Sequence, residues 1–307
     1  MSEKITIRMG GYGPPTTTHS RGLKFIGDRL TEQFGDRIKI VYVWNVMDLG
    51  YGSDAVLWLN ECGILDLVYM STTALTARVP ELEFVDLPFL FADNDEARAA
   101  YDGALGRHLI DAVERNCNFK VLGFFENGFR HLSNRLHEMR RPADLAGMSI
   151  RTLGSEMHNR TFELLGMAPQ SMRLDEAKIA IAENRVDAQE NPFANTMTYG
   201  IHLAHKFHTL SSHFYLSRGV YANPQKFDAW PDDIRAAVLA AMPGAVTHQR
   251  GLAVAEEDIA RAEIEKVGGA VHVLTSEEHD AFAAAVSPIY TEARERFGDE
   301  MFAMIGR

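Results

Sequence analysis

The apolar residues near the start of the chain change from a spacing of two to a spacing of three and four. Ile5, Ile7 and Met9 alternate with other residues, which predicts a strand over residues 4–9. The next apolar residues lie on one face of a predicted helix: Leu23, Ile26, Leu30 and Phe34. Residues 38–43 return to strand character, so the whole stretch predicts a βαβ unit.

The alternation of predicted strands and helices continues as far as residue 125. We predict a helix around residues 53–61, an apolar strand over 64–69 and a further strand over 120–125. Between the last two, one apolar stripe has the spacing of a helix face: Ala97, Tyr101, Leu105, Leu109 and Val113. Strands that alternate with helices predict parallel sheets covered by helices on both faces.

A second series of alternating elements begins near residue 148. Its predicted strands cover residues 148–152, 167–171, 186–189 and 213–221. Its predicted helices run from Gly154 to Gly166 and onward from Leu174. Two such series in 307 residues predict two lobes of roughly 150 residues each.

A long helical stretch is predicted after Trp230. Pro231 suits a first helical position, and the acidic residues 232–233 favour a helix N-terminus. Pro243-Gly244 should break or kink this helix near its middle, with a further helix running to about Val267.

The charge balance limits the partners that the chain can have. It carries 42 acidic and 31 basic residues, a net charge of -11, and no basic run, which argues against nucleic acid and anionic membrane surfaces. No segment approaches the ~18 apolar residues that span a bilayer, so we expect no membrane insertion. An anion site in such a chain must therefore be built from a few locally placed arginines.

The compartment is left open by the sequence itself. Residues 1–4 lead into the first strand without the charged start, apolar core and cleavage site of a signal peptide. Two interpretations remain, a cytoplasmic protein and a mature exported chain that lacks its leader. Cys62 and Cys117 are too few for a disulfide framework and lack metal-ligand spacing, and whether they pair is open.

Three polar residues lie at the edges of predicted strands: Arg130, Arg151 and Asn191. Ligand sites of open α/β sheets lie at the carboxyl ends of strands. The planar fork of arginine matches a carboxylate through two parallel charge-assisted hydrogen bonds, and asparagine can add a donor. Because no acid adjoins either arginine in the sequence, we expect an anion site rather than a salt bridge.

The histidines are the most enzyme-like feature. His202, His205 and His208 recur at every third residue, with His213 beyond, and neutral imidazoles bind zinc or nickel. However, successive steps of three drift around a helix, and neither HExxH nor a placed general base accompanies them. We therefore expect no catalytic residue, no metal site and no cofactor.

Several segments together resemble the substrate-binding proteins of TRAP transporters, the DctP family of receptors for organic acids. The resemblance covers nearly the whole chain and is carried by Leu49-Gly50, Cys62 to Leu67, Val85 to Phe91, Asn127 to Arg130, Asp144 to Arg151, Gly166 to Pro169 before Glu176, and Val186 to Pro192. It implies a two-lobe α/β fold of the periplasmic-binding-protein type II class, with a hinge, crossing strands and a long helix across both lobes. We expect residues 1–126 and 215–252 in lobe I, and 127–214 and 253–307 in lobe II.

The resemblance also implies what the chain does. It indicates a periplasmic receptor, not an enzyme, which binds a small organic carboxylate between the lobes and delivers it to the membrane subunits of a TRAP transporter. Two alternatives remain open. The same cleft could serve a membrane sensor protein, and a weaker alternative is a metal-dependent enzyme that uses the histidines.

The resemblance assigns roles to individual residues. The arginine that matches Arg151 forms the salt bridge to the ligand carboxylate, and the residues that match Arg130 and Asn191 commonly contact the ligand. Further candidates are polar residues at other strand ends and in the Gly10 to Thr18 turn, namely Tyr69, Ser71, Thr72, Thr16 and Thr17, although the threonines could instead cap the next helix. An apolar wall is expected from Leu174, Phe193 and Phe214.

These residues leave the ligand undecided between two classes. Two arginines permit a dicarboxylate, whereas the apolar wall suits a monocarboxylate with an apolar or aromatic body, which we favour. The chain departs from the family pattern at Pro243-Gly244, at Ala188, where glycine is usual, and at Arg173, which we expect to point to solvent. The export signal of the family is also missing.

Overall fold

The computed structural model describes residues 4–307, whose contacts group them into two compact units. Unit 1 extends to Thr72 and includes Ile110–Glu126 and Ser217–Val254; unit 2 comprises Thr73–Leu109, Asn127–Leu216 and Ala255–Arg307. The predicted division placed residues 73–109 in lobe I. The structure groups them with unit 2, because the 3₁₀ segment Pro80–Asp86 packs against helices of that unit.

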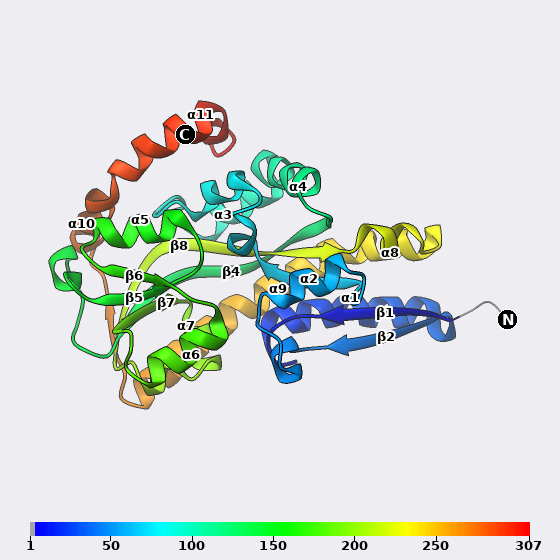
Figure 1. Ribbon diagram of the computed structural model, residues 1–307, viewed down its shortest axis with the longest axis horizontal. Helices are drawn as coiled ribbons and strands as arrows, with labels where there is room; N and C mark the ends of the chain where they lie inside the picture. The colour runs from blue at the N-terminus through cyan, green and yellow to red at the C-terminus, as the bar shows by residue number, and fades with distance from the viewer. Residues whose placement is uncertain (1–3) are drawn as a thin grey trace. The chain divides into compact units, whose positions relative to one another are not determined.

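Unit 1 is built on a sheet with the strand order β2-β1-β3-β8. Figure 1 shows its first strands, β1 (Ile5–Gly10) and β2 (Ile38–Val43), side by side, with α1 (Thr18–Phe34) running along them. Strand β1 pairs in parallel with β2 and with β3 (Leu67–Ser71), as predicted. The remaining helices that lie wholly in this unit are α2 (Ala55–Glu61) and α8 (Pro224–Asp228).

The core of unit 1 follows the two apolar periods of the sequence. Ile7 and Met9 of β1 are fully buried, and so are the residues of the predicted face of α1: Leu23, Ile26 and Leu30. The helix begins where Thr17 caps it, since the Thr17 hydroxyl accepts a hydrogen bond from the Ser20 backbone N–H. The alternation and the helical stripe therefore predicted the core correctly.

Unit 2 contains a second sheet segment with the order β4-β7-β5-β6. Strand β5 (Ser149–Thr152) pairs in parallel with β6 (Ala168–Ser171) and β7 (Ala188–Asn191). The other elements of the unit are α3 (Asn94–Asp102), α5 (Glu156–Leu164), α6 (Leu174–Ala182), α7 (Phe193–Thr198), β9 (Ala270–Val273), α10 (Ser276–Val286) and α11 (Pro288–Ala303). The apolar stripe predicted over residues 97–113 forms two helices, α3 and α4 (Ala104–Asn116), which are separated at Gly103.

Four elements have residues in both units: α4, β4 (Lys120–Asn134), β8 (Phe207–Ala222) and α9 (Asp232–Lys266). Both strands extend well beyond the predicted ranges 120–125 and 213–221. They also make the sheet mixed rather than parallel, because β8 pairs antiparallel with β3, and β4 pairs antiparallel with β7. In β4, Gly128 has φ +89°, a left-handed conformation that side chains disfavour, and it lies two residues past the last β4 residue of unit 1.

Of the break or kink predicted at Pro243, the break is wrong, because α9 continues from Asp232 to Lys266 with Pro243 inside it. A proline within a helix leaves the carbonyl four residues earlier without its N–H donor, here that of Leu239. Pro243 is exposed and Leu239 is 46% exposed, so water can take the place of that donor. No helix of residues 4–307 is long and apolar enough to cross a membrane.

We therefore expect Pro243→Ala to stabilise the chain by about 1–3 kcal/mol, since it restores one helical hydrogen bond and removes the clash of the ring. Urea denaturation of both proteins at neutral pH measures the change. Gly251→Ala, in the same helix with open space around the added Cβ, is the control and should stabilise by about 1 kcal/mol. A Pro243→Ala protein no more stable than the original would contradict the prediction.

Candidate functional site

Arg151 lies in the middle of the parallel strands of unit 2. In the sheet register it stands between Gln170 of β6 and Gln189 of β7, and it is 3% exposed. Its Nε and Nη2 both donate to the backbone carbonyl of Met172, at 3.1 and 2.7 Å. Since Met172 directly follows β6, this carbonyl orients the guanidinium at the carboxyl end of the strand, where an anion site was predicted.

Arg130 of β4 is held by an acid that the sequence did not reveal. Its Nε donates to Glu190 Oε2, its Nη2 donates to Glu190 Oε1 at 2.8 Å, and Nη2 also donates to the Glu190 carbonyl at 2.7 Å. Both side chains are buried, with 2% and 0% exposed. The expectation that no acid neutralises this arginine is therefore wrong, because Glu190 lies sixty residues away in sequence but on the strand paired with β4.

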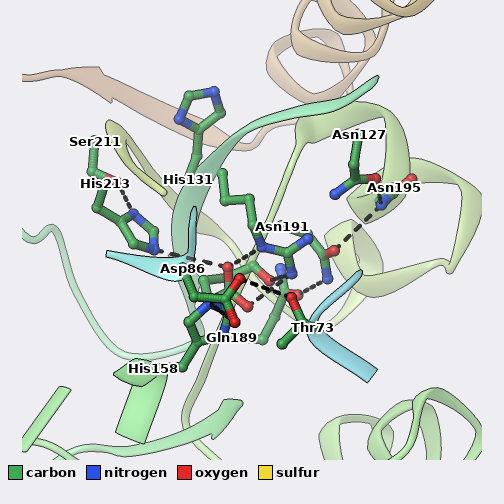
Figure 2. Close-up of polar contacts among 12 residues, drawn as sticks. Thr73, Asp86, Asn127, His131, His158, Gln189, Asn191, Asn195, Ser211 and His213 are labelled. Carbon is green, nitrogen blue, oxygen red and sulfur yellow. Dashed lines mark hydrogen bonds and ion pairs between the residues drawn. The ribbon is translucent and has the colours of Figure 1, made fainter. Parts of the chain in front are cut away.

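Asn191 belongs to a network of amide side chains. Its Nδ2 donates to Gln189 Oε1, and its Oδ1 accepts from Asn195 Nδ2 at 3.4 Å. Asn195 Nδ2 also donates to Asn127 Oδ1 at 3.0 Å, and Figure 2 shows this line of amides from Asn191 to Asn127. Gln189 also stands beside Arg151 in the strand register. The structure thus connects Asn191 with the strand that carries Arg151, through Gln189.

Asp86 is a buried acid close to these arginines. Thr73 Oγ1 donates to its Oδ1 at 3.0 Å, while His158 Nε2 lies 3.8 Å from its Oδ2, beyond hydrogen-bond distance (Figure 2). Burial raises the pKa of Asp86 to about 8, although Ser155, Thr73 and Arg130 act in the opposite direction. At neutral pH this carboxyl is therefore mostly protonated and supplies little negative charge.

Two histidines whose pKa values are lowered by burial and by the charge of Arg130, namely His158 and His213, are neutral. Burial holds the pKa of His158 well below its usual value, and the charges of Arg130 and Arg151 lower that pKa further. Burial also lowers the pKa of His213, whose Nδ1 bonds to Ser211 Oγ at 2.7 Å (Figure 2). These two imidazoles therefore add no positive charge beside the guanidinium groups.

His202, His205 and His208, which are spaced three residues apart, each contact a different partner. His205 Nδ1 pairs with Ser133 Oγ at 3.0 Å, His208 Nε2 with the His205 carbonyl at 3.0 Å, and His202 Nδ1 with the Thr196 carbonyl at 3.4 Å. Within residues 4–307 no group of three or more His, Cys, Asp and Glu side chains is arranged to hold a metal ion. Cys62 and Cys117 do not form a disulfide with each other.

The polar residues of unit 1 that were predicted to contact the ligand differ in burial and in hydrogen bonding. Tyr69 Oη lies 3.2 Å from Ser20 Oγ, and Thr72 Oγ1 lies 3.2 Å from Ser217 Oγ. Thr17 caps α1, which is the alternative role considered for it, and Thr16 is exposed. The Ser71 hydroxyl is buried and has no hydrogen-bond partner among the described residues.

The three residues expected to form an apolar wall are all buried in unit 2. Phe193 packs in a core cluster with Ala260 and Ile264. Phe214 stacks on His158 with ring centroids 4.2 Å apart, and Leu174 is 7% exposed at the start of α6. These contacts are those of core residues, so the wall gives no strong preference for an apolar ligand.

Two other arginines, Arg173 and Arg218, differ in their exposure to solvent. Arg173 was expected to point to solvent; its side chain is 47% exposed and pairs with Asp175 and Glu176 at 3.3 and 3.0 Å. Arg218, which was not singled out, lies in β8 of unit 1 and is only 5% exposed. The signal was present in the sequence, because Arg218 is the one charge in the strand residues Phe214 to Ala222.

The buried ion pair of Arg130 and Glu190 leads to a prediction about stability. Glu190→Gln leaves the guanidinium of Arg130 buried without a counter-charge, which should cost about 3–5 kcal/mol, whereas the double change Arg130→Met with Glu190→Leu should cost less than Glu190→Gln alone. Urea unfolding at pH 7 without ligand measures both. The exposed pair Arg185–Glu183 is the control, and Glu183→Gln should cost less than about 1 kcal/mol. Equal losses for Glu190→Gln and Glu183→Gln would refute it.

Asp86 generates a prediction on pH. Its pKa of about 8 in the folded chain lies above the value of about 3.9 in an unfolded chain, so the folded state holds the extra proton between these values. Its contribution to stability is therefore full below pH 4 and declines as the pH rises towards 8. Asparagine imitates the protonated acid and cannot ionise.

Between pH 5 and pH 9, the free energy of unfolding of Asp86→Asn relative to the original chain should therefore rise by more than about 1.4 kcal/mol, the equivalent of one pKa unit. Urea denaturation at both pH values measures this difference. The fully exposed Asp36→Asn should follow the original chain at both. A constant difference between Asp86→Asn and the original chain would show that Asp86 is ionised throughout.

Comparison with known proteins identifies the family. The family model of the bacterial extracellular solute-binding proteins, family 7 (DctP), matches residues 9–296. The 2,3-diketo-L-gulonate-binding periplasmic protein YiaO of Escherichia coli is 31% identical over 281 residues, which are 92% of this chain and 84% of YiaO.

Two solved structures share the fold of this chain over nearly its whole length. A TRAP periplasmic solute-binding protein from Polaromonas, bound to D-erythronate, has a TM-score of 0.91 and 26% identity, with 98% of each chain covered. One from Sulfurospirillum deleyianum, with bound succinate, has a TM-score of 0.92 and 27% identity, again with 98% of each chain covered. This chain, which has the two-lobe type II fold of those receptors, belongs to the DctP family of TRAP-transporter substrate-binding proteins.

Proposed function

We propose that the chain is an extracytoplasmic receptor that binds a small organic carboxylate and delivers it to the membrane subunits of a TRAP transporter. Its family consists of solute-binding proteins. D-erythronate and succinate, which are bound in two related structures, both carry a carboxylate. The chemistry common to these ligands is the group that a guanidinium recognises best.

The observation that carries the proposal is the position of Arg151. Its guanidinium is buried at the carboxyl end of a parallel strand, and the Met172 carbonyl holds two of its nitrogens on one side. A guanidinium oriented in this way loses little side-chain entropy when a carboxylate binds. Glu190 neutralises Arg130, so we assign Arg130 the role of shaping the site through Glu190 rather than of supplying its net charge.

Capture and closure follow from the family fold. In the proposed mechanism the ligand carboxylate meets Arg151 and the amide of Asn191 in unit 2. A ligand favours the closed state only as far as it binds that state better than the open one.

A substitution series at Arg151 tests the proposal. We first expect a thermal-shift screen with succinate, D-erythronate and other small organic acids to raise the unfolding temperature, since a ligand at ~100 times its Kd stabilises by about 2.7 kcal/mol. For the acid that binds best, Arg151→Ala should weaken binding by about 2–5 kcal/mol, or about 30- to several-thousand-fold. Arg151→Lys should also bind poorly, because an ammonium cannot reproduce the fork.

The control is Arg173→Ala, which removes an exposed arginine that directly follows Met172 and pairs with Asp175 and Glu176. It should leave the affinity unchanged. Isothermal titration calorimetry measures all four proteins. If Arg151→Ala binds the acid as tightly as the original chain, Arg151 is not the carboxylate-binding residue.

A further inference from the structure

Three polar side chains of unit 2 tie the carboxyl ends of β5 and β6 together, and we call them the strand-end network: Thr152, Asn159 and Ser171. Thr152 Oγ1 donates to Asn159 Oδ1 at 2.7 Å, and Asn159 Nδ2 donates to Ser171 Oγ at 3.2 Å. The hydroxyls of Thr152 and Ser171 lie 3.3 Å apart. None of the three was predicted from the sequence to take part in the site.

The strand register sets the geometry of the network. Thr152 and Ser171 are partners in the parallel pair of β5 and β6, so their side chains project from the same face of the sheet. Helix α5 packs against both strands (Figure 1), and Asn159 lies in it four residues after the capping residue Ser155. A single helical side chain therefore reaches the ends of both strands.

Arg151 is connected to this network through the backbone. It directly precedes Thr152, so its side chain projects from the opposite face of the sheet. Met172, which directly follows Ser171, donates its backbone N–H to the Thr152 carbonyl at 3.2 Å. The carbonyl of Met172 accepts from Nε and Nη2 of Arg151. The residue that orients the guanidinium is therefore itself held at the end of β6.

Strand β6 needs such support because its backbone pairing is limited. It is only four residues long, Ala168–Ser171, and it is the last strand in the sheet order β4-β7-β5-β6. It contains Pro169, which has no N–H to donate to a neighbouring strand. Short strand ends open locally at a free energy far below that of global unfolding. Side-chain hydrogen bonds thus contribute a large share of what keeps this end closed.

A closed strand end matters for binding because it fixes the orientation of the guanidinium. When the end of β6 opens, the Met172 carbonyl moves away and Arg151 loses the acceptor of two of its nitrogens. The apparent affinity of a ligand falls with the fraction of chains that are ready to bind it. A side chain that keeps β6 closed therefore increases the affinity without touching the ligand.

We propose that Asn159, together with Thr152 and Ser171, is a positioning residue for carboxylate binding, because it fixes the Met172 carbonyl that orients Arg151. The inference rests on the proposed function, in which Arg151 binds the ligand carboxylate. It assigns a role to the face of the sheet opposite to the arginine. The hydroxyl of Thr152 and the amide of Asn159 then act as one unit.

Proton exchange at the Arg151 Nε–H tests the positioning without a ligand. A hydrogen-bonded N–H exchanges slowly with water, and Arg151→Lys identifies the signal in a ¹H–¹⁵N spectrum by removing it. Asn159→Ala and Thr152→Val should speed this exchange by about 2- to 12-fold, the effect of one lost hydrogen bond. The Arg130 Nε–H, which Glu190 holds, is the internal reference and should not change, whereas a general folding defect would speed both. Unchanged exchange at Arg151 in both variants would overturn the proposal.

A matched pair of substitutions at Thr152 separates positioning from packing. Thr152 is fully buried; valine keeps its volume and removes the hydroxyl, whereas serine keeps the hydroxyl and removes a methyl group. Calorimetry uses the tightest-binding acid of the thermal-shift series that includes succinate and D-erythronate. Thr152→Val should weaken binding by about 2- to 12-fold, and Thr152→Ser by less than about 2-fold. If serine weakens binding as much as valine, the hydroxyl does not position the site.

Asn159→Ala should weaken binding by the same factor as Thr152→Val. Because the two side chains act as one unit, the double variant should bind within about 2-fold of Asn159→Ala alone. Asn118→Ala is the matched control, since it removes an exposed asparagine of unit 1 that pairs with Gln225. It should bind as the original chain does. Losses that multiply in the double variant would contradict a shared role.

The two proposals fail in different ways. If none of the acids binds, or if Arg151→Ala binds the acid as tightly as the original chain, the receptor proposal fails. If Arg151 is required but Asn159→Ala and Thr152→Val bind as the original chain does, only the positioning role fails.

Discussion

The bidentate pair between Arg130 and Glu190 is the interaction on which the interior of unit 2 depends. A guanidinium can be buried in a strand only when its charge and its donors are satisfied, and Glu190 meets both requirements from the neighbouring strand. This pair fixes β4 against β7 and thereby the positions of Gln189 and Asn191 on either side of Glu190. The amide network that leads towards Arg151 is a consequence of that pairing.

The same rule governs the other ionisable groups of the interior. Asp86 keeps its proton, and His158 and His213 remain neutral, because burial disfavours their charged forms. The interior thus contains few net charges. A buried charge without a counter-charge is therefore unusual and needs an explanation. Arg218 is such a charge in unit 1, since among residues 4–307 neither its Nη1 nor the hydroxyl of Ser71, its partner in the strand register, has a hydrogen-bond partner.

Local patterns predicted the elements that have a single apolar face. Strands β1 and β2 and helix α1 follow the periods of Ile7, Ile38 and Leu23, and their buried residues are those expected. The long strands were missed because residues 126–134 are mostly polar and are satisfied by partners far away in the sequence. The Glu190 partner of Arg130 could not be found for the same reason, since pairing of β4 with β7 is a tertiary property. The break predicted at Pro243 was wrong because helix propensity is a local preference, and the packing of a long helix overrides it.

The proton on Asp86 links the folding of the chain to its medium. At pH 7 the folded chain holds this proton and the unfolded chain releases it, while each buried neutral histidine takes up about a quarter of a proton when unfolding returns its pKa to about 6.5. The contribution of Asp86 to unfolding is thus the release of about one proton into the buffer. The heat that accompanies this release includes the ionisation enthalpy of the buffer, so the contribution of Asp86 to the apparent enthalpy of unfolding differs between phosphate and Tris although the protein is the same.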